Sequence, residues 1–208
     1  MEKKRRGRVS SIAENRGRPR EFDLSSVLDG AVLVFREKGY NSASLSDLCT
    51  ATSLSTGSIY KAFKDKKGLF LAAFAHYLSQ RNEELSTRLA GITTGRDQLE
   101  AFIKMYVDSS KGKEGLRGCM VISAMTEITT LDPELALKVR EAYKRLELKL
   151  LQIFQAGKVD GSLSVPDNPE SMICMLLCTL QGMRLAGKVG YVDTSSETIV
   201  EEIMHFYV

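Results

Sequence analysis

Apolar residues recur at helical spacing along almost the whole chain after residue 22, and this pattern constrains the fold more than any other feature. The segment after Pro133 shows it most clearly, because its apolar residues share one helical face opposite a charged one: Leu135, Val139, Ala142, Leu146, Leu150 and Ile153. We find no convincing run of the apolar–polar alternation that is typical of a half-buried strand. The sequence therefore predicts an all-α fold of about nine helices.

Residues that begin and end helices set the expected boundaries. Short polar residues that cap helix N-termini stand before many of the apolar segments: Asp23, Ser44, Ser55, Asp65, Asp132 and Asn168. Proline follows the last two, at the position it favours in the first turn, and Gly39 is typical of a helix end. We expect helices over residues 24–38, two short ones beginning near 44 and 55, one from 65 to 89, and then 95–110, 117–130, 133–156, 169–187 and 196–207.

Positive charge is concentrated at the N-terminus. Residues 1–20 hold eight basic side chains against two acidic ones, whereas the rest of the chain holds 21 basic and 24 acidic ones. The formal net charge of +3 therefore conceals a basic arm on a slightly acidic body. This asymmetry is expected of a protein that binds nucleic acid or another anionic surface. Because residues 1–22 also lack hydrophobic periodicity, we expect them to be a disordered basic arm.

Several functional classes lack their sequence signals. No apolar run follows the basic start, as a secretory signal requires, and the longest uncharged apolar-rich stretch, residues 171–183, is shorter than a membrane span. The four cysteines and two histidines form neither a disulfide framework nor a metal-binding pattern. The common hydrolase, phosphate-loop, zinc-protease and dinucleotide motifs are absent. We therefore expect a cytoplasmic protein that is not an enzyme, with no metal, no cofactor and no membrane partner.

Residues 44–70 carry the most specific pattern in the chain. Two short helices separated by Thr52-Ser53-Leu54 predict a helix-turn-helix, although such a pair alone is a weak signal. The run Ser44-Leu45-Ser46-Asp47-Leu48, then Leu54-Ser55-Thr56-Gly57-Ser58-Ile59-Tyr60-Lys61-Ala62-Phe63 and on to Gly68-Leu69-Phe70 resembles the DNA-binding signature of the TetR (tetracycline-repressor) family. The resemblance covers residues 22–75. It implies a helix-turn-helix DNA-binding domain over 23–68 and a ligand-sensing and dimerisation domain over 69–208.

The resemblance also implies a set of DNA-contacting residues: Ser44, Thr56, Gly57, Ser58, Tyr60, Lys61 and Lys66. Thr56, Ser58 and Lys61 would reach base edges in the major groove, and Gly57 would let the backbone approach the DNA. The others would hold phosphates together with the amides at helix N-termini. The alternative for Tyr60 and Lys61 is a solvated helix surface.

Two positions depart from the usual family pattern. Ser53 stands where the turn commonly has glycine, so it is mildly strained if it adopts a left-handed conformation. Ala62 stands where an aromatic residue is common. One DNA contact is therefore in doubt, and the operator preference of relatives does not carry over.

The basic arm contains a second candidate DNA reader. Arg16-Gly17-Arg18-Pro19-Arg20 is similar to the AT-hook core, an extended segment that lies in narrow A·T minor grooves. Glycine allows close approach to the groove floor, proline keeps the backbone extended, and Arg16, Arg18 and Arg20 would meet its negative potential. The alternative is a solvated tail that only raises non-specific affinity.

For the C-terminal part, the resemblance implies a homodimer that binds a palindromic operator in double-stranded DNA and a pocket for an unknown small-molecule effector. The helices at 169–187 and 196–207 would form the dimer interface, and the usual outcome is a repressor released by its effector. The candidate pocket residues are Tyr77, Met105, Tyr106, Cys119, Met120, Met125, Tyr143, Gln181 and Arg184. Such side chains are also common in plain helical cores.

Cys119 carries a separate hypothesis. It is expected near the start of the helix at 117–130, where the helix dipole and Arg117 would lower the thiol pKa and favour a reactive thiolate. Some regulators of this type sense oxidants or electrophiles, so a thiol-reactive effector is one interpretation. The other is a small buried side chain without chemistry.

Overall fold

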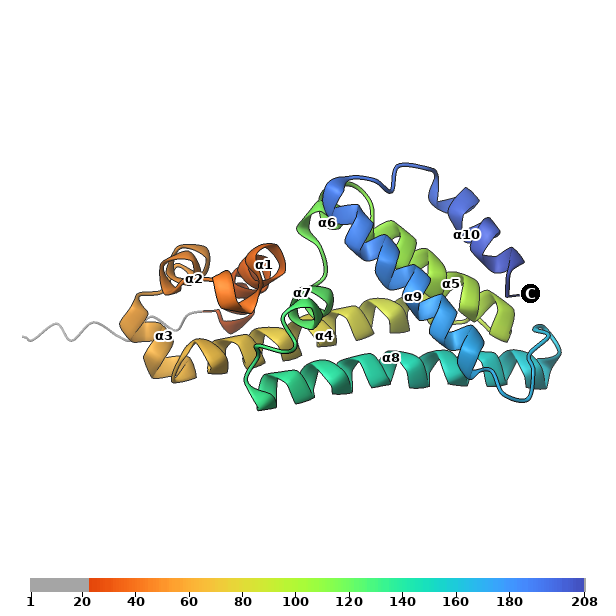
Figure 1. Cartoon of the computed structure of the whole chain (residues 1–208), viewed down its shortest axis with the longest axis horizontal. Coiled ribbons are helices and arrows are strands. Elements are labelled where there is room, and N and C mark those ends of the chain that lie inside the picture. The colour runs from red at the N-terminus through yellow and green to blue at the C-terminus, as the bar shows by residue number, and fades with distance from the viewer. Residues whose placement is uncertain (1–22, 208) are drawn as a thin grey trace, which may run out of the picture.

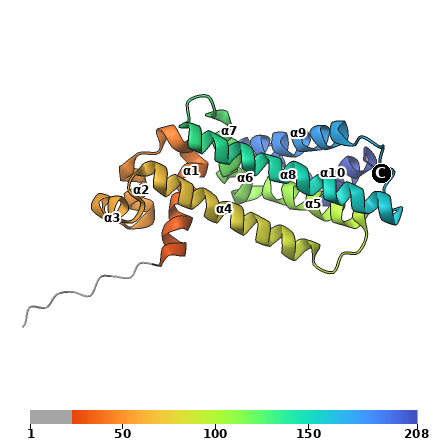
Figure 2. The same cartoon turned by 90° about the horizontal axis from the view of Figure 1, so that it is seen from below.

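The computed structural model describes residues 23–207. Within these residues the chain forms ten α-helices, one short 3₁₀-helix and no strand, so the prediction of an all-α fold is confirmed. Figure 1 shows three helices, α1 to α3, at one end of an elongated molecule and a larger helical bundle at the other. The long helix α4 runs from the first group into the second, and Figure 2 shows it running alongside α8.

The N-terminal group consists of α1 (Leu24–Ser42), α2 (Leu45–Thr52) and α3 (Thr56–Phe63). Their predicted N-caps are confirmed, because Asp23, Ser44 and Ser55 each accept a backbone N–H bond with the side chain. Gly39 has a left-handed φ of 78°, which breaks the helical geometry of α1 where its end was predicted, although three further residues follow in the same element.

Helix α4 (Lys66–Leu89) is held to the N-terminal group by aromatic packing. Phe70 meets Phe35 of α1 edge to face at 5.0 Å between ring centroids, and it stacks on Phe74 of its own helix at 5.6 Å. All three rings are buried, together with Leu48 of α2 and Ile59 of α3. Any shift of α4 is therefore transmitted to α1 by direct packing.

The larger bundle is built from α4, α5 (Gly95–Ser109), α8 (Pro133–Asp160), α9 (Glu170–Ala186) and α10 (Ser196–His205). Helix α8 ends four residues later than predicted, where Gly161 takes a left-handed conformation. The 3₁₀-helix η1 (Gly187–Val189) continues α9. The core of the bundle includes Leu99, Phe102, Leu150, Phe154 and Leu176, all almost fully buried.

The single helix predicted at 117–130 is wrong. The segment instead forms α6 (Gly112–Arg117) and α7 (Met120–Thr126), separated at Gly118. Gly118 has a φ of 79°, which ordinary L-residues rarely adopt, so the helix stops there. Its position at the domain junction explains the break, because its carbonyl accepts hydrogen bonds from Arg36 of α1 and Arg184 of α9.

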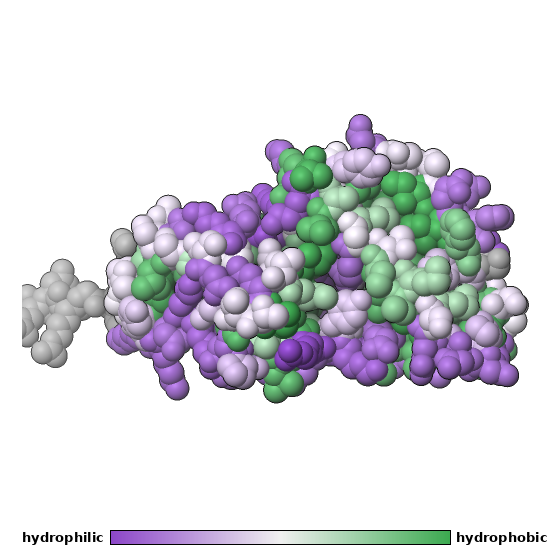
Figure 3. All heavy atoms as spheres, viewed as in Figure 1, coloured by the Kyte–Doolittle hydropathy of each residue, from purple (hydrophilic) through white to green (hydrophobic). Residues whose placement is uncertain are grey.

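Helix α9 with η1 is long and apolar enough to cross a membrane by length and composition alone. The span Glu170–Val189 has a mean hydropathy of 1.3 and is one-third buried within the fold. This is weak evidence, since core helices of soluble proteins pass the same test. Figure 3 shows hydrophobic residues gathered over the outward face of this helix, where Met175 and Leu185 are exposed.

Candidate nucleic-acid interface and ligand cavity

The turn between α2 and α3 presents one face of α3 to solvent. Ser53 closes the turn in the left-handed conformation, with φ 56°, so the strain expected from the missing glycine is present. Thr56, Tyr60 and Lys61 are exposed, and Tyr60 keeps 48% of its surface open. Ser58 is half-buried, and its hydroxyl lies 2.9 Å from that of Ser55. Of the predicted base-reading side chains, Thr56 and Lys61 are thus open to solvent and Ser58 is half-covered.

Gly57 on that surface is not required by the fold. A Cβ atom added there would meet only the Ser55 hydroxyl oxygen, at 3.9 Å, which is ordinary contact. Gly30 of α1 is the opposite case, because an added Cβ would lie 2.3 Å from the Ala51 carbonyl oxygen. Gly30 is thus explained by packing of α1 on α2. Packing within the described protein therefore does not explain why residue 57 is glycine.

Two predicted phosphate contacts have other partners in the structure. Lys66 Nζ donates to the carbonyls of Tyr40 at 2.9 Å and Ala43 at 3.0 Å, and lies 4.6 Å from the Tyr40 ring centroid. These bonds cap the C-terminus of α1, and the phosphate contact of Lys66 stays a prediction. Ser44 is exposed, but its hydroxyl accepts from the Asp47 amide at 3.1 Å in a capping box.

The arginines of the predicted minor-groove arm, Arg16, Arg18 and Arg20, lie outside the described residues. Their role remains the prediction made from the sequence.

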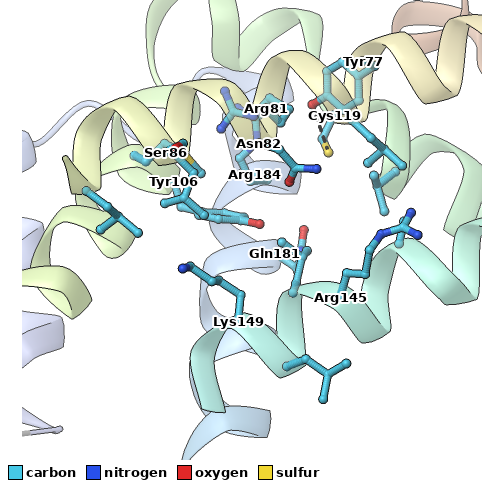
Figure 4. Close-up of a pocket in the computed structure, with 18 of the residues that line it drawn as sticks. Tyr77, Arg81, Asn82, Ser86, Tyr106, Cys119, Arg145, Lys149, Gln181 and Arg184 are labelled. Atoms are coloured by element: carbon cyan, nitrogen blue, oxygen red, sulfur yellow. Dashed lines mark hydrogen bonds between the residues drawn. The ribbon is translucent and has the colours of Figure 1, made fainter. Parts of the chain in front are cut away.

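A cavity of about 740 Å³ opens between α4, α5, α8 and α9 in the larger bundle. Tyr77, Tyr106, Cys119 and Arg184 line it, as predicted from the sequence, and so do Met105 and Gln181. Figure 4 shows the polar groups of these residues converging from three sides. The remaining wall is largely apolar: Leu78, Leu85, Leu89, Val121, Ala142, Leu146 and Leu148.

Three predicted pocket residues, Met120, Met125 and Tyr143, do not line this cavity. Met120 is fully buried in the core between the two helical groups and does not line the cavity. Tyr143 faces a separate hollow of about 320 Å³, which it shares with Met125. All three were assigned to the cavity because helical periodicity gives the inward face of a helix but not the neighbour it packs against.

The basic residues of the cavity were not predicted from the sequence. Arg81 on α4, and Arg145 and Lys149 on α8, also line it, and together with Arg184 they make four cations. No Asp or Glu is present among the lining residues in the described part of the chain. In the sequence pattern of each helix, these residues look like ordinary solvated charges. Only the packing of α4 beside α8 places them around one cavity.

Cys119 lies at the cavity wall, partly exposed, with its thiol facing Tyr77 and Arg184. The Tyr77 hydroxyl donates to Cys119 Sγ at 3.4 Å. Burial raises the pKa of the Cys119 thiol, but the positive charge of Arg184 and the hydrogen bond from Tyr77 outweigh it, so the pKa lies below its usual value. The expected direction is thus found, with Arg184 as the source of charge instead of Arg117, which is exposed.

A hydrogen-bonded junction links this cavity to the N-terminal group of helices. Arg36 of α1 is buried, and its Nε donates to the Gly118 carbonyl at 2.8 Å while its Nη2 pairs with Glu114 at 2.6 Å. Arg184 Nη2 donates to the same Gly118 carbonyl at 3.0 Å. One backbone oxygen therefore joins α1 to the cavity wall on α9. The residues of this junction are far apart in the sequence, so the helical spacing of apolar residues could not predict it.

Two family models match the chain. The model described as "Bacterial regulatory proteins, tetR family" matches residues 27–73, and "Tetracyclin repressor-like, C-terminal domain" matches residues 95–202. The uncharacterised HTH-type transcriptional regulator YezE of Bacillus subtilis (strain 168) is 30% identical over 77% of this chain and 83% of its own length. The HTH-type transcriptional repressor ComR of Escherichia coli (strain K12) is 24% identical over 86% of each chain.

Solved structures have the same fold. A cysteine mutant of the TetR family transcriptional regulator CifR, in complex with a 26 bp operator DNA, is 28% identical and has a TM-score of 0.77 over 90% of this chain and 98% of that one. The reduced form of NemR from E. coli, at 17% identity and a TM-score of 0.76 over 88% of this chain and 95% of that one, shows likeness of fold alone.

Proposed function

The chain is a DNA-binding transcriptional regulator that belongs to the TetR family, and from this premise we propose that it is a dimeric repressor released from its operator by a small molecule. Residues 23–68 act as the DNA-binding domain, with the arm at 1–22 beside it, and residues 69–208 sense the effector and form the dimer in the cytoplasm. The outward face of α3, with Gly57 at a position where the fold has no need of glycine, is the observation that carries the proposal.

We place the DNA contacts on that face. Thr56, Ser58 and Lys61 read base edges from the major groove, and Tyr60 contacts the backbone. Ser44 and Lys66 support the interface indirectly, because their side chains hold the ends of α2 and α1 in place. Arg16, Arg18 and Arg20 add minor-groove contacts.

Dimerisation is assigned to the outward face of α9 with its neighbours. Met175 and Leu185 of α9, Tyr191 and Phe206 are exposed, the last two by about four-fifths of their surface. A second copy of the chain would cover this apolar face through a two-fold interface, in which the same residues meet from both sides. A two-fold dimer matches a palindromic operator.

The effector binds in the cavity lined by Tyr77, Tyr106, Cys119 and Arg184. It favours an arrangement of α4 in which the spacing of the two DNA-binding domains of the dimer no longer matches the operator. A thiol-reactive effector is the second candidate for the chemistry. The observation that favours it is the position of Cys119 in the cavity wall, beside the guanidinium of Arg184.

The proposal is tested by selecting bound sequences from a random DNA pool with the wild type and with a Tyr60→Ala, Lys61→Ala double variant. We expect the wild type to recover a palindromic site and the double variant to lose at least about tenfold in affinity for it, because base and phosphate contacts are removed. If the wild type enriches no sequence, the repressor proposal fails.

Gly57→Ala separates DNA contact from folding more cleanly. Alanine is about 1 kcal/mol more favourable than glycine inside a helix, and the fold has room for it, so thermal stability should be unchanged or higher. Operator affinity should fall, since the added methyl group stands between the backbone and the DNA. Gly30→Ala is the matched control, because its clash with the Ala51 carbonyl should lower stability. A Gly57→Ala variant with full operator affinity would refute the contact.

A further inference from the structure

Arg184 is a buried cation whose charge is incompletely compensated by the residues around it. Its exposure is 2%, and its Nη2 is bonded to the neutral Gly118 carbonyl. Its Nη1 has no hydrogen-bond partner among the described residues. Leaving one nitrogen of a buried guanidinium without a hydrogen bond is costly, and a ligand that enters the cavity would satisfy it.

A second orphaned polar atom lies on the same face of α9. Gln181 Oε1 is also buried without a partner, one helical turn before Arg184. The amide oxygen and nitrogen of a glutamine can exchange places by rotation, so this side chain offers either an acceptor or a donor. Figure 4 shows the Gln181 amide and the Tyr106 hydroxyl both directed into the cavity. Burial raises the pKa of Tyr106, so its hydroxyl stays protonated and can donate.

The charge of the cavity points in the same direction. Four basic side chains and no acidic one are found among its described lining residues. One of the four, Arg81, is paired with Glu84 and bonded to Ser109, so part of its charge is already compensated. Arg145 and Lys149 stand on α8, across the cavity from α4. A site with fixed cations and low dielectric walls concentrates anions.

We propose that the effector is a small organic carboxylate with an apolar body, whose carboxylate binds Arg184 Nη1 beside Gln181 while the apolar part lies against the leucines of α4 and α8. This inference rests on the proposed function for its meaning in regulation, but binding itself is independent of DNA. A carboxylate fits better than a neutral polar group because it supplies the charge that the guanidinium lacks. The apolar wall favours a body of several carbon atoms over a small inorganic anion.

The test is direct calorimetric titration of the full chain with matched pairs of probes. Octanoate, benzoate and 4-phenylbutanoate are compared with octanamide, benzamide and 4-phenylbutanamide, which have the same bodies without the charge. We expect at least one carboxylate to bind at least about tenfold more tightly than its amide, the difference that a charge-assisted hydrogen bond makes. Equal affinity within every pair, or no binding by any probe, would overturn the proposal.

Two substitutions locate the site. Arg184→Gln should abolish the preference for the carboxylate, whereas Arg184→Lys keeps the charge and part of the preference. Arg117→Gln is the matched control, since Arg117 is exposed and outside the cavity, and it should change nothing. A preference that survives in Arg184→Gln would contradict the assignment.

Gln181→Glu tests the same site without removing the buried arginine, in case the Arg184 variants do not fold. Glutamate has nearly the same shape and keeps Arg184 in place, while it adds a carboxylate of the chain itself one helical turn before the guanidinium. Carboxylate probes should then lose at least about tenfold in affinity, while the amides are unaffected. Unchanged carboxylate affinity in this variant would also overturn the proposal.

Operator binding of the same proteins keeps the two proposals apart. If wild type binds an operator but no probe behaves as described, only the carboxylate inference fails. If carboxylates bind as expected and no operator is found, the repressor proposal fails while the binding site stands.

Discussion

Cys119 shows at the scale of one residue how packing sets chemistry. Its thiol is held between the Tyr77 hydroxyl and the charge of Arg184, and its pKa lies below the usual value despite burial. A thiol whose pKa is lower in the folded than in the unfolded chain stabilises the fold above the unfolded pKa. That contribution is lost as the pH falls through the folded pKa.

We predict that limiting iodoacetamide alkylates Cys119 before the other three thiols at neutral pH, because the thiolate is the nucleophile. Cys178 should be slow, since burial and neighbouring Cys174 raise its pKa. The Cys119 rate should fall as the pH is lowered and should also fall in Arg184→Gln. Mass spectrometry of peptides measures each rate. A Cys119 that reacts no faster than the others would remove the thiol-reactive effector from consideration.

Other single residues show which local features were readable in the sequence. The caps at Asp23, Ser44 and Ser55 were predicted, because they depend on neighbours within a few residues. For Ser53 the sequence indicated only that a left-handed conformation would be strained, and the structure has that conformation. Lys66 was assigned to phosphate because its position in the motif was known, whereas its carbonyl partners lie about 25 residues earlier in the chain.

At the scale of helices, periodicity located nearly every element but not its neighbours. The break at Gly118 was missed because it satisfies partners on α1 and α9, which no local pattern reveals. The same limit applies to the cavity, where Arg81, Arg145 and Lys149 become one cationic wall only after α4 packs beside α8. The outward face of α9 was readable, since a helix that is apolar nearly all round needs cover on more than one side.

We predict that Met175→Glu on α9 converts the proposed dimer to a monomer, because the substitution would place a carboxylate from each copy in the proposed apolar interface. Light scattering after gel filtration measures the mass. Affinity for the DNA site recovered by selection should fall at least about tenfold, because the two DNA-binding domains would no longer bind as a linked pair. Val159→Glu is the matched control, since Val159 is an exposed apolar residue at the end of α8. A Met175→Glu protein that stays dimeric would place the interface elsewhere.

At the scale of the whole molecule, the Gly118 carbonyl is where the cavity meets the DNA-binding domain. Arg36 reaches it from α1 and Arg184 from α9, while Glu114 fixes Arg36 from the other side. A ligand that draws the Arg184 guanidinium toward the cavity would leave the carbonyl to Arg36 alone. The orientation of α1 would then change together with that of α4, which packs on it through Phe70. Two sites coupled in this way bias a common pair of arrangements.

This coupling predicts that Arg36→Gln and Arg184→Gln are not additive in their effect on stability. Each single variant leaves the Gly118 carbonyl one donor, whereas the double variant leaves this buried acceptor without either, so the double loss should exceed the sum by about 0.5–3 kcal/mol. Thermal unfolding at one fixed protein concentration measures the four proteins of the cycle. In the control cycle Lys38→Gln replaces Arg36→Gln, because Lys38 is on the same helix but pairs with Asp47 at the surface. The effect of Lys38→Gln on stability should add to that of Arg184→Gln. Additivity in both cycles would mean that the shared carbonyl does not couple the domains, and the path to the operator would then run through α4 alone.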